Sequence, residues 1–305
     1  MRKIIITGPT GAIGTALVAV CISHGIQVTA VCRPGSQRIG ALPESNLLCT
    51  VKCSLEDMDK LPDLVRDRDY DTFFHLGWAG TFGECRNDLT KQVQNIQYTL
   101  NAVKTAYILG CTKFVGAGSQ AEYGRKKEAL KTDTSVCPEN GYGMAKLCAG
   151  QMSKVLCEQM GMEHVWARVL SVYGPNDGRH VMVMSVIDQL LHGKEPAVSK
   201  GEQVWDYLYS EDAAKAFYLI GEKGVHGKAY PVGSGSARPL RQYMEIIRDA
   251  IDPGLSLGIG KRPYACKQVM HLCADISELA KDTGFEPEHS FETGIRQTIA
   301  WCREN

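Results

Sequence analysis

The chain alternates between two hydrophobic patterns over its first 170 residues. Segments with apolar residues at every third or fourth position predict helices at 12–24, 88–110 and 142–160. Short, nearly continuous apolar runs predict strands at 2–7, 27–32, 47–52, 71–76, 112–117 and 163–170. Apolar strands that alternate with helices are typical of a parallel sheet that is covered on both faces. The pattern therefore predicts an α/β fold with a Rossmann-type, doubly wound parallel sheet.

The regularity loosens after Tyr173-Gly174-Pro175. Helices are predicted at 180–193 and 239–251, and the segment 203–222 reads as a strand followed by a helix. Asp275-Ile276-Ser277-Glu278 has the spacing of a capping box and predicts that a late helix opens there. These weaker signals indicate a smaller C-terminal α/β lobe.

Three glycines follow the first predicted strand, and a helical pattern follows the glycines. In such a strand–turn–helix the first glycine makes the tight turn, the second lets a pyrophosphate approach the backbone, and the third packs helix against strand. The helix N-terminus then offers free N–H groups to the phosphates. The alternative is an ordinary Gly-rich turn. We predict a dinucleotide site at Gly8, Thr10, Gly11, Ala12, Ile13 and Gly14.

Tyr142 and Lys146 lie four residues apart on a predicted helix, so both side chains project from one face. An ammonium beside a phenol favours the phenolate and lowers the tyrosine pKa towards working pH. Ser119 ends a predicted buried strand and can hydrogen-bond the same substrate oxygen. A tyrosine and a lysine at this spacing also occur on solvated helix faces. Because the glycine turn, Ser119 and this pair occur in the order that one site requires, we predict that all three residues are catalytic.

These motifs resemble those of the extended short-chain dehydrogenases/reductases, in the NAD-dependent epimerase/dehydratase family that mostly modifies nucleotide sugars. The resemblance covers nearly the whole chain and rests on 7–14, 74–77, Asn95 with Thr99, 119–124, 142–146, 168–175, 205–212, 230–233 and 274–301. It implies that Lys146 also binds the nicotinamide ribose. It further implies cofactor contacts from Tyr142, Leu55, Leu76, Gly77, Trp78, Asn95 and Val172.

The resemblance also divides the chain. It implies a dinucleotide-binding domain over 1–170, to which 203–228 returns, and a mainly substrate-binding lobe made of 171–202 and 229–305. We interpret three charged residues as structural, although each would look catalytic in isolation. His75 ends a strand beside the cofactor, Arg168 is expected to pair with a buried carboxylate, and Asp212 is expected to cap a helix that begins at Ala213.

Composition narrows the partners. Lys and Arg together number 34 and so do Asp and Glu, so no basic surface indicates nucleic acid. No apolar run approaches the length of a membrane span, and the first residues already form a strand pattern, so we expect no membrane segment and no signal peptide. The chain has 12 cysteines but no Cys-x-x-Cys pair and no metal-ligand spacing. We expect reduced thiols, no bound metal and a cytoplasmic location.

The end of the second strand bears on the choice of cofactor. NAD enzymes place an acid there for the ribose hydroxyls, whereas NADP enzymes avoid the acid and supply an arginine. Cys32 stands at that position and Arg33 follows it, with Ser36 and Arg38 nearby. The alternative is that Arg33 is a solvated loop residue. The missing carboxylate is a separate signal, and we predict that NADP(H) is favoured over NAD(H).

The residues after Ser119 bear on the reaction. The family's 4,6-dehydratases place acids there for the proton transfers that dehydration adds to hydride chemistry. Gln120 and Ala121 occupy those positions, and Glu122 is one place further along, where a strand or tight turn would point it elsewhere. Dehydration is therefore disfavoured. Ketone reduction, alcohol oxidation and epimerisation through a transient ketone need only the three predicted catalytic residues.

Two positions depart from the family pattern at the substrate diphosphate. Ser171 replaces a common asparagine, and Trp205 replaces a family arginine, whose loss removes a bidentate phosphate contact. Trp205 can stack on a base or sugar, or fill the space of the phosphate. Arg179 and Arg262 are the candidate replacements, although an arginine is more often a surface residue. We predict substrate contacts from Ser171, Arg179, Trp205 and Arg262.

Together these features predict an NAD(P)-dependent 4-keto-6-deoxysugar-nucleotide reductase or a sugar-nucleotide epimerase. The alternatives are a dinucleotide-sensing protein that lost the chemistry and a reductase of a non-nucleotide carbonyl compound. The resemblance further implies a homodimer, in which helices 88–110 and 142–160 pair with their twofold mates as a four-helix bundle. The apolar residues assigned to that contact are Val93, Ile96, Leu100, Val103, Met144, Leu147, Met152 and Val155. The alternative is a monomer in which these extra apolar residues only cover the sheet.

Overall fold

The structure is a computed structural model that describes residues 1–265 and 267–305. Its main sheet has seven strands in the order β10-β6-β5-β4-β1-β2-β3, and every neighbouring pair is parallel. The strands are β1 (Lys3–Thr7), β2 (Gln27–Cys32), β3 (Leu48–Lys52), β4 (Thr72–His75), β5 (Lys113–Ser119), β6 (Glu163–Val169) and β10 (Ala229–Val232). The doubly wound parallel sheet is confirmed, and six of its strands coincide with the predicted ones except at their ends.

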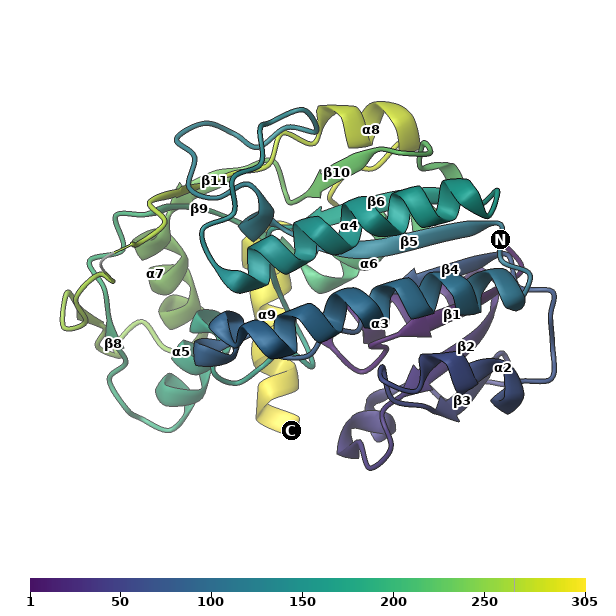
Figure 1. Cartoon of the computed structure of the whole chain (residues 1–305). Coiled ribbons are helices and arrows are strands. Elements are labelled where there is room, and N and C mark those ends of the chain that lie inside the picture. Colours follow the sequence, from purple (N-terminus) through teal and green to yellow (C-terminus); the bar gives the residue numbers. More distant parts are fainter. Residues whose placement is uncertain (266) are drawn as a thin grey trace.

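Helices cover both faces of this sheet (Figure 1). On one face α1 (Ala12–Ser23) and α6 (Ser210–Lys223) bury Leu17 and Phe217 against Ile4 and Ile6 of β1. On the other face α3 (Leu89–Ile108) and α4 (Gly141–Gln159) belong to a second buried cluster, which contains Ile5. Successive side chains of a strand point to opposite faces, so an unbroken Ile-Ile-Ile run supplies both cores.

A smaller lobe carries a second sheet. Its central strand β9 (Val204–Tyr209) pairs with β7 (Ser171–Tyr173), β11 (Ala237–Pro239) and β13 (His271–Leu272). A further pair joins β8 (Ala197–Val198) to β12 (Gly258–Ile259). The helices of this lobe are α5 (Met182–Leu191), α7 (Leu240–Ile251) and α9 (Phe291–Glu304), whose buried residues form one apolar cluster. Of the segment expected to return to the first domain, α6 packs on the main sheet while β9 pairs in the smaller lobe. β10 then completes the edge of the main sheet.

Two local predictions about helix ends were wrong. The helix α8 (Ser277–Thr283) does open after Asp275, but Ile276 is its cap residue, and the Asp275 carboxylate accepts the Ser277 N–H at 3.0 Å instead of closing a capping box. Asp212 does not cap a helix, because α6 already begins at Ser210. Its carboxylate instead accepts the N–H groups of Glu288 and His289, which ties α6 to the segment before α9.

The sequence predicted that the chain has no membrane-spanning segment, and this prediction can be compared with the helices of the structure. None of those within 1–265 and 267–305 combines the length and the apolar character that crossing a membrane requires.

Candidate functional site

The glycine turn after β1 has the geometry that each glycine was expected to supply. Gly8 adopts φ 68°, and a Cβ there would lie 2.8 Å from the Gly77 nitrogen. A Cβ on Gly14 would lie 2.2 Å from the Gly8 oxygen, so only glycine lets α1 sit this close to the turn. Gly11 caps α1 without a side-chain hydrogen bond, and no acid stands in the first turn. The N–H groups at this helix end therefore remain available to an anion, as a dinucleotide pyrophosphate requires.

Two cavities meet at this turn, and Gly8 lines both. The first has a volume of about 440 Å³ and extends towards the ends of β2 and β3. Of the predicted cofactor residues it is lined by Gly8, Thr10, Arg33, Leu55, Gly77 and Trp78. The second has a volume of about 530 Å³ and extends towards the smaller lobe. It is lined by Gly8, Gly11, Ala12, Ile13, Gly14, Leu76, Tyr142 and Val172.

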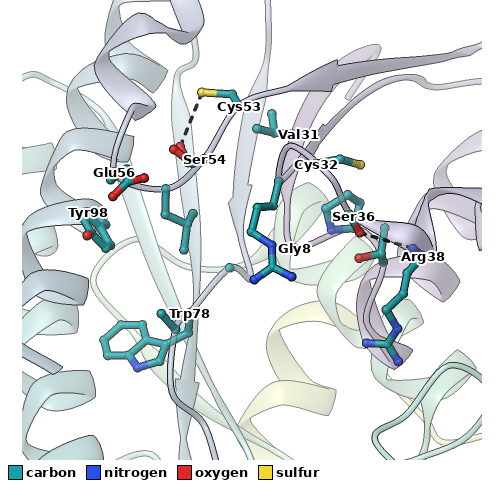
Figure 2. A pocket seen from close by; sticks show the side chains of 16 residues that line it. Gly8, Val31, Cys32, Ser36, Arg38, Cys53, Ser54, Glu56, Trp78 and Tyr98 are labelled. Atoms are coloured by element: carbon teal, nitrogen blue, oxygen red, sulfur yellow. Dashed lines mark hydrogen bonds between the residues drawn. The ribbon is translucent and has the colours of Figure 1, made fainter. Parts of the chain in front are cut away.

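The first cavity has an uneven distribution of charge. Cys32, Ser36 and Arg38 lie along one side of it, and Glu56 with Tyr98 lies on the other (Figure 2). Arg33 also lines this cavity. Glu56 is the one acid among the lining residues that the structure describes, and it is exposed. NAD enzymes have a ribose-binding acid at the end of β2. This chain instead has the buried Cys32 thiol there, with Arg33 and Arg38 nearby.

The three predicted catalytic residues lie together at the second cavity. Ser119 ends β5, and Tyr142 projects from the first turn of α4; both line the cavity and both are buried. The Asn140 side chain caps α4 by accepting the Gly143 N–H at 2.8 Å, which fixes this turn. Lys146 lies one turn further along α4, where its Nζ donates to the Ala117 oxygen at 2.6 Å. The C-terminal end of strand β5 and the N-terminal turns of helix α4 therefore bring these residues together.

The electrostatics of this group differ from the expectation. Burial lowers the pKa of Lys146 to about 7, although the Glu122 carboxylate opposes the shift. Its Nζ lies 3.8 Å from the centre of the Trp78 ring and 6.0 Å from that of Tyr142. Burial raises the pKa of Tyr142, while the Ser119 hydroxyl and the Arg86 guanidinium lower it. Lys146 therefore does not lower the pKa of Tyr142 here, because burial dominates and the ammonium lies over Trp78.

Arg86 and Asp177 also line the second cavity, and sequence reasoning did not find them. The Arg86 guanidinium carbon lies 4.4 Å from the centre of the Tyr142 ring. Burial raises the pKa of Asp177 to about 6, against the opposing effects of the Gly178 N–H and Arg38. Arg86 comes from a short 3-10 helix (Gly83–Asn87) and Asp177 from an irregular segment, and neither is long enough for a periodic pattern to mark a position as facing a cavity.

Four predicted binding residues are absent from the lining of both cavities: Lys146, which lies behind Tyr142, and the three residues described next. Asn95 is buried, and its side-chain amide bonds the backbone N–H and oxygen of Ala79 at 2.8 and 2.9 Å, which fixes the loop after β4. Arg179 is exposed and contacts Asp188 at 3.4 Å and the Asn305 oxygen at 2.9 Å. Arg262 is exposed as well, and it is absent from the lining of both cavities.

The other two predicted substrate residues do line the second cavity. The Trp205 Nε1 donates to the Ser171 hydroxyl at 2.8 Å. This hydrogen bond fixes the position of the Trp205 indole in the cavity wall. The sequence had left two roles open for this indole, namely stacking on a base or sugar and filling the space of the phosphate. Trp205 and Tyr207 together form an aromatic wall on the side of the cavity that the smaller lobe provides.

Glu122 and His75 have structural roles. The Glu122 carboxylate accepts hydrogen bonds from the Ser119 N–H at 2.8 Å, the Trp166 Nε1 at 3.0 Å and the Arg168 Nε at 2.8 Å. The predicted pairing of Arg168 with a buried carboxylate is confirmed. His75 lies between the hydroxyls of Thr7 and Thr99, and burial lowers its pKa to about 3, so it stays neutral at physiological pH. Within the described ranges no group of three His, Cys, Asp or Glu side chains is placed to hold a metal ion.

Comparisons with known proteins agree with this fold. Residues 4–233 match the model of a family described as the NAD dependent epimerase/dehydratase family. A dTDP-glucose 4,6-dehydratase from Escherichia coli is 26% identical over 179 residues, which cover 56% of this chain and 50% of that protein. The match thus spans about half the length of the first curated relatives.

Solved structures are similar over nearly the whole chain. A UDP-N-acetylglucosamine 4-epimerase from Methanobrevibacter ruminantium, in complex with UDP-N-acetylmuramic acid, superimposes with a TM-score of 0.89 and 25% identity, over 99% of this chain and 98% of that one. A UDP-glucuronic acid 4-epimerase from Bacillus cereus, in complex with NAD, has a TM-score of 0.85 and 19% identity over 99% of both chains.

Proposed function

This chain belongs to the NAD-dependent epimerase/dehydratase family, and on that premise we propose that it is a sugar-nucleotide epimerase that works through a transient ketone. The observation that carries the proposal is one cavity in which Ser119 and Tyr142 lie beside the glycine turn, with Lys146 directly behind them. The 4-epimerase names of the solved relatives support it.

The chain's residues fit each proton movement of this reaction. A bound nicotinamide supplies the hydride acceptor and donor. The Tyr142 phenolate takes the proton of a ring alcohol as the C–H hydride leaves, and it returns that proton when hydride is delivered to the opposite face of the ketone. The Ser119 hydroxyl donates a hydrogen bond to the reacting oxygen and, with the Arg86 guanidinium, favours the Tyr142 phenolate against the effect of burial. Lys146 would hold the nicotinamide ribose.

Dehydration remains disfavoured in this proposal. It would need an acid free to move protons at neighbouring sugar carbons. Glu122, the nearest acid after Ser119, is buried and already accepts three hydrogen bonds, so its carboxylate is not free for this role. Asp177 lines the cavity, but it comes from the segment after β7 and not from the positions after Ser119. Gln120 lines the cavity, and it has no proton to donate as an acid.

A 4-keto-6-deoxysugar-nucleotide reductase is the second candidate, and the first cavity favours it. A reductase consumes its cofactor, and the side of this cavity with Cys32 and Arg38 suits the 2′-phosphate of NADP(H) rather than the ribose hydroxyls of NAD(H). The NAD named with the Bacillus cereus epimerase supports the other cofactor.

Cofactor preference is tested by titration. We expect NADP(H) to bind about tenfold or more tightly than NAD(H), because a charge-assisted phosphate contact contributes about 1.5–3 kcal/mol. Arg33→Ala should narrow that gap. Fluorescence titration of both reduced cofactors into the wild type and the variant measures it, with exposed Arg296→Ala as the control. Tighter NAD(H) binding by the wild type would show that the prediction of NADP(H) is wrong.

The activity test begins with the full chain and its cofactor, incubated with UDP-, dTDP- and GDP-linked sugars and their 4-keto derivatives. NMR of the sugar products distinguishes epimerisation from reduction, and NADPH absorbance reports net consumption. Tyr142→Phe should lower turnover by roughly two to four orders of magnitude, the usual range for a general acid/base, while cofactor binding survives. Tyr218→Phe, which changes a tyrosine whose ring lies tilted against that of His24, is the control. Turnover of Tyr142→Phe near that of the wild type would reject the site.

We also propose a homodimer formed by α3 and α4, on the exposed apolar side chains that these two helices carry. The most exposed of them are Leu89, Val93, Tyr107, Ile108, Met144, Met152 and Val155.

A further inference from the structure

Arg86 is the one cation among the lining residues described for the second cavity, and Asp177 is the one acid. Within the described chain, no hydrogen bond or ion pair engages the Arg86 side chain. Its guanidinium carbon lies over the Tyr142 ring, 4.4 Å from the ring centre. That contact uses the face of the aromatic ring and none of the five guanidinium N–H donors. The cavity therefore presents an unoccupied guanidinium directly beside the proposed proton donor.

Within residues 1–265 and 267–305, no other lysine or arginine lines this cavity to take the place of Arg86. Arg179 is held at the surface by Asp188 and the Asn305 oxygen, and Arg262 is exposed outside the cavity. Lys146 is buried behind Tyr142, with its ammonium bound to the Ala117 oxygen. The aromatic wall of Trp205 and Tyr207 offers no charge to an anion.

We propose that Arg86 binds an oxyanion of the substrate, as a pair of carboxylate or phosphate oxygens, next to the carbon on which Tyr142 acts. The planar guanidinium matches two such oxygens with two parallel N–H bonds, which a lysine cannot do. The inference rests on the proposed function for the place of the reacting carbon. It adds a substrate class, namely a sugar nucleotide whose anionic group reaches the catalytic tyrosine.

Two parts of a substrate can supply the oxyanion, the diphosphate or a carboxylate on the sugar. Isothermal titration of the cofactor-loaded protein with UDP, UDP-glucose and UDP-glucuronic acid distinguishes them. A sugar carboxylate predicts that UDP-glucuronic acid binds roughly 10–100-fold more tightly than UDP-glucose, and that Arg86→Gln removes only this gain. A diphosphate predicts that Arg86→Gln weakens all three ligands by a similar factor. Either result supports the proposal.

Arg86→Lys keeps the charge and loses the planar fork, so it should recover only part of the affinity. Arg296→Gln, which changes an exposed arginine on α9, should leave all three affinities unchanged. Circular dichroism and cofactor affinity verify that each variant is folded. If the folded Arg86→Gln variant binds all three ligands as the wild type does, the proposal is overturned.

Two nucleotide-free probes separate this inference from the proposed function. Inorganic pyrophosphate and glucuronate should each bind the wild type weakly and lose that binding in Arg86→Gln. Retained binding of either probe, without binding or turnover of any sugar nucleotide, would reject the proposed function and leave the oxyanion site standing. Absence of any Arg86-dependent affinity for every anion tested would overturn the oxyanion site, whatever the sugar nucleotides do.

Discussion

At the residue scale, the same type of side chain has different roles according to what surrounds it. Glu122 and Asp177 are both carboxylic acids near the second cavity. Glu122 accepts three hydrogen bonds, whereas Asp177 accepts one, from the Gly178 N–H at 2.7 Å. A buried carboxylate with few donors holds its proton more tightly, because the charged form loses hydration without compensation.

Asp177 therefore predicts a pH dependence of stability. Burial raises its pKa from 3.8 to about 6. The folded state binds this proton more tightly than the unfolded state, so the free energy of unfolding falls as pH rises from about 4 to about 6. Asp177→Asn should raise that free energy by about 1–3 kcal/mol at pH 7.5 and change it little at pH 4. Urea unfolding at both pH values measures the effect.

The control for this experiment is Asp63→Asn, which changes an exposed aspartate of α2 (Leu61–Leu64). It should leave stability unchanged at both pH values. If Asp177→Asn gives the same increment at pH 4 as at pH 7.5, the carboxyl does not titrate between them and the raised pKa is wrong.

At the element scale, the position of α4 on the sheet depends on one tryptophan. Trp166 on β6 packs against Gly116 and Gly118 of β5 and Gly150 of α4, where added Cβ atoms would lie 2.1, 2.3 and 2.7 Å from its ring. Its Nε1 donates to Glu122, which also binds the Ser119 N–H. The helix that carries Tyr142 and the strand end that carries Ser119 are thus held together around one indole.

Gly150→Ala tests this packing. The new methyl group would meet the rigid Trp166 ring at 2.7 Å, so the helix or the indole must move. We expect a loss of about 1–3 kcal/mol in the free energy of unfolding, the usual cost of overpacking a filled site. Gly40→Ala is the matched control, because a Cβ there meets no atom within 4 Å. Chemical denaturation of both variants decides it, and equal stabilities would contradict the tight contact.

At the scale of the whole molecule, α3 and α4 leave a groove of about 520 Å³ between them. It is lined by Leu100, Met152, Val155 and Leu156 together with polar residues. Val93 and Val155 are 62% and 52% exposed, a large apolar surface for two neighbouring helices. Val103, also assigned to the contact surface, is instead fully buried in the core beneath α3. The apolar residues assigned to the contact surface therefore fall into two groups. Some, such as Val103, pack in the core beneath the helices, and others, such as Val93 and Val155, lie on the outer surface.

The proposed dimer predicts a mass of twice 33.5 kDa by light scattering at micromolar concentration. A self-complementary patch closes as a twofold pair, so each substitution acts twice in the interface. Val155→Glu should therefore shift the population towards the monomer. Val225→Glu, at an apolar residue that is 41% exposed and outside these helices, is the control. A wild-type mass of 33.5 kDa would reject the dimer.

Six of the seven strands of the main sheet and the order of the site residues could be predicted from the sequence, whereas the edge strand β10 was not predicted. Both follow from local rules, since a parallel strand buried on both faces must be apolar throughout, and a helix must repeat its apolar positions every three or four residues. The turn around Gly8 could be recognised from its glycine. Its backbone has φ 68°, a conformation that glycine adopts without strain, so the residue type marks the turn in the sequence. The smaller lobe has short strands paired over long sequence separations, and its pattern was correspondingly weak.

Which side chains share a cavity could not be predicted from the sequence, because it depends on how distant segments pack. Arg86 reaches Tyr142 from the short 3-10 helix Gly83–Asn87, whereas Arg179 is bound to Asp188 and Asn305, and no periodic pattern in either short segment distinguishes the two arginines. The pKa of Tyr142 likewise depends on burial and on Arg86, rather than on the lysine one turn away. Contacts of this kind depend on how distant elements pack, because charge and hydration act through space and not along the chain.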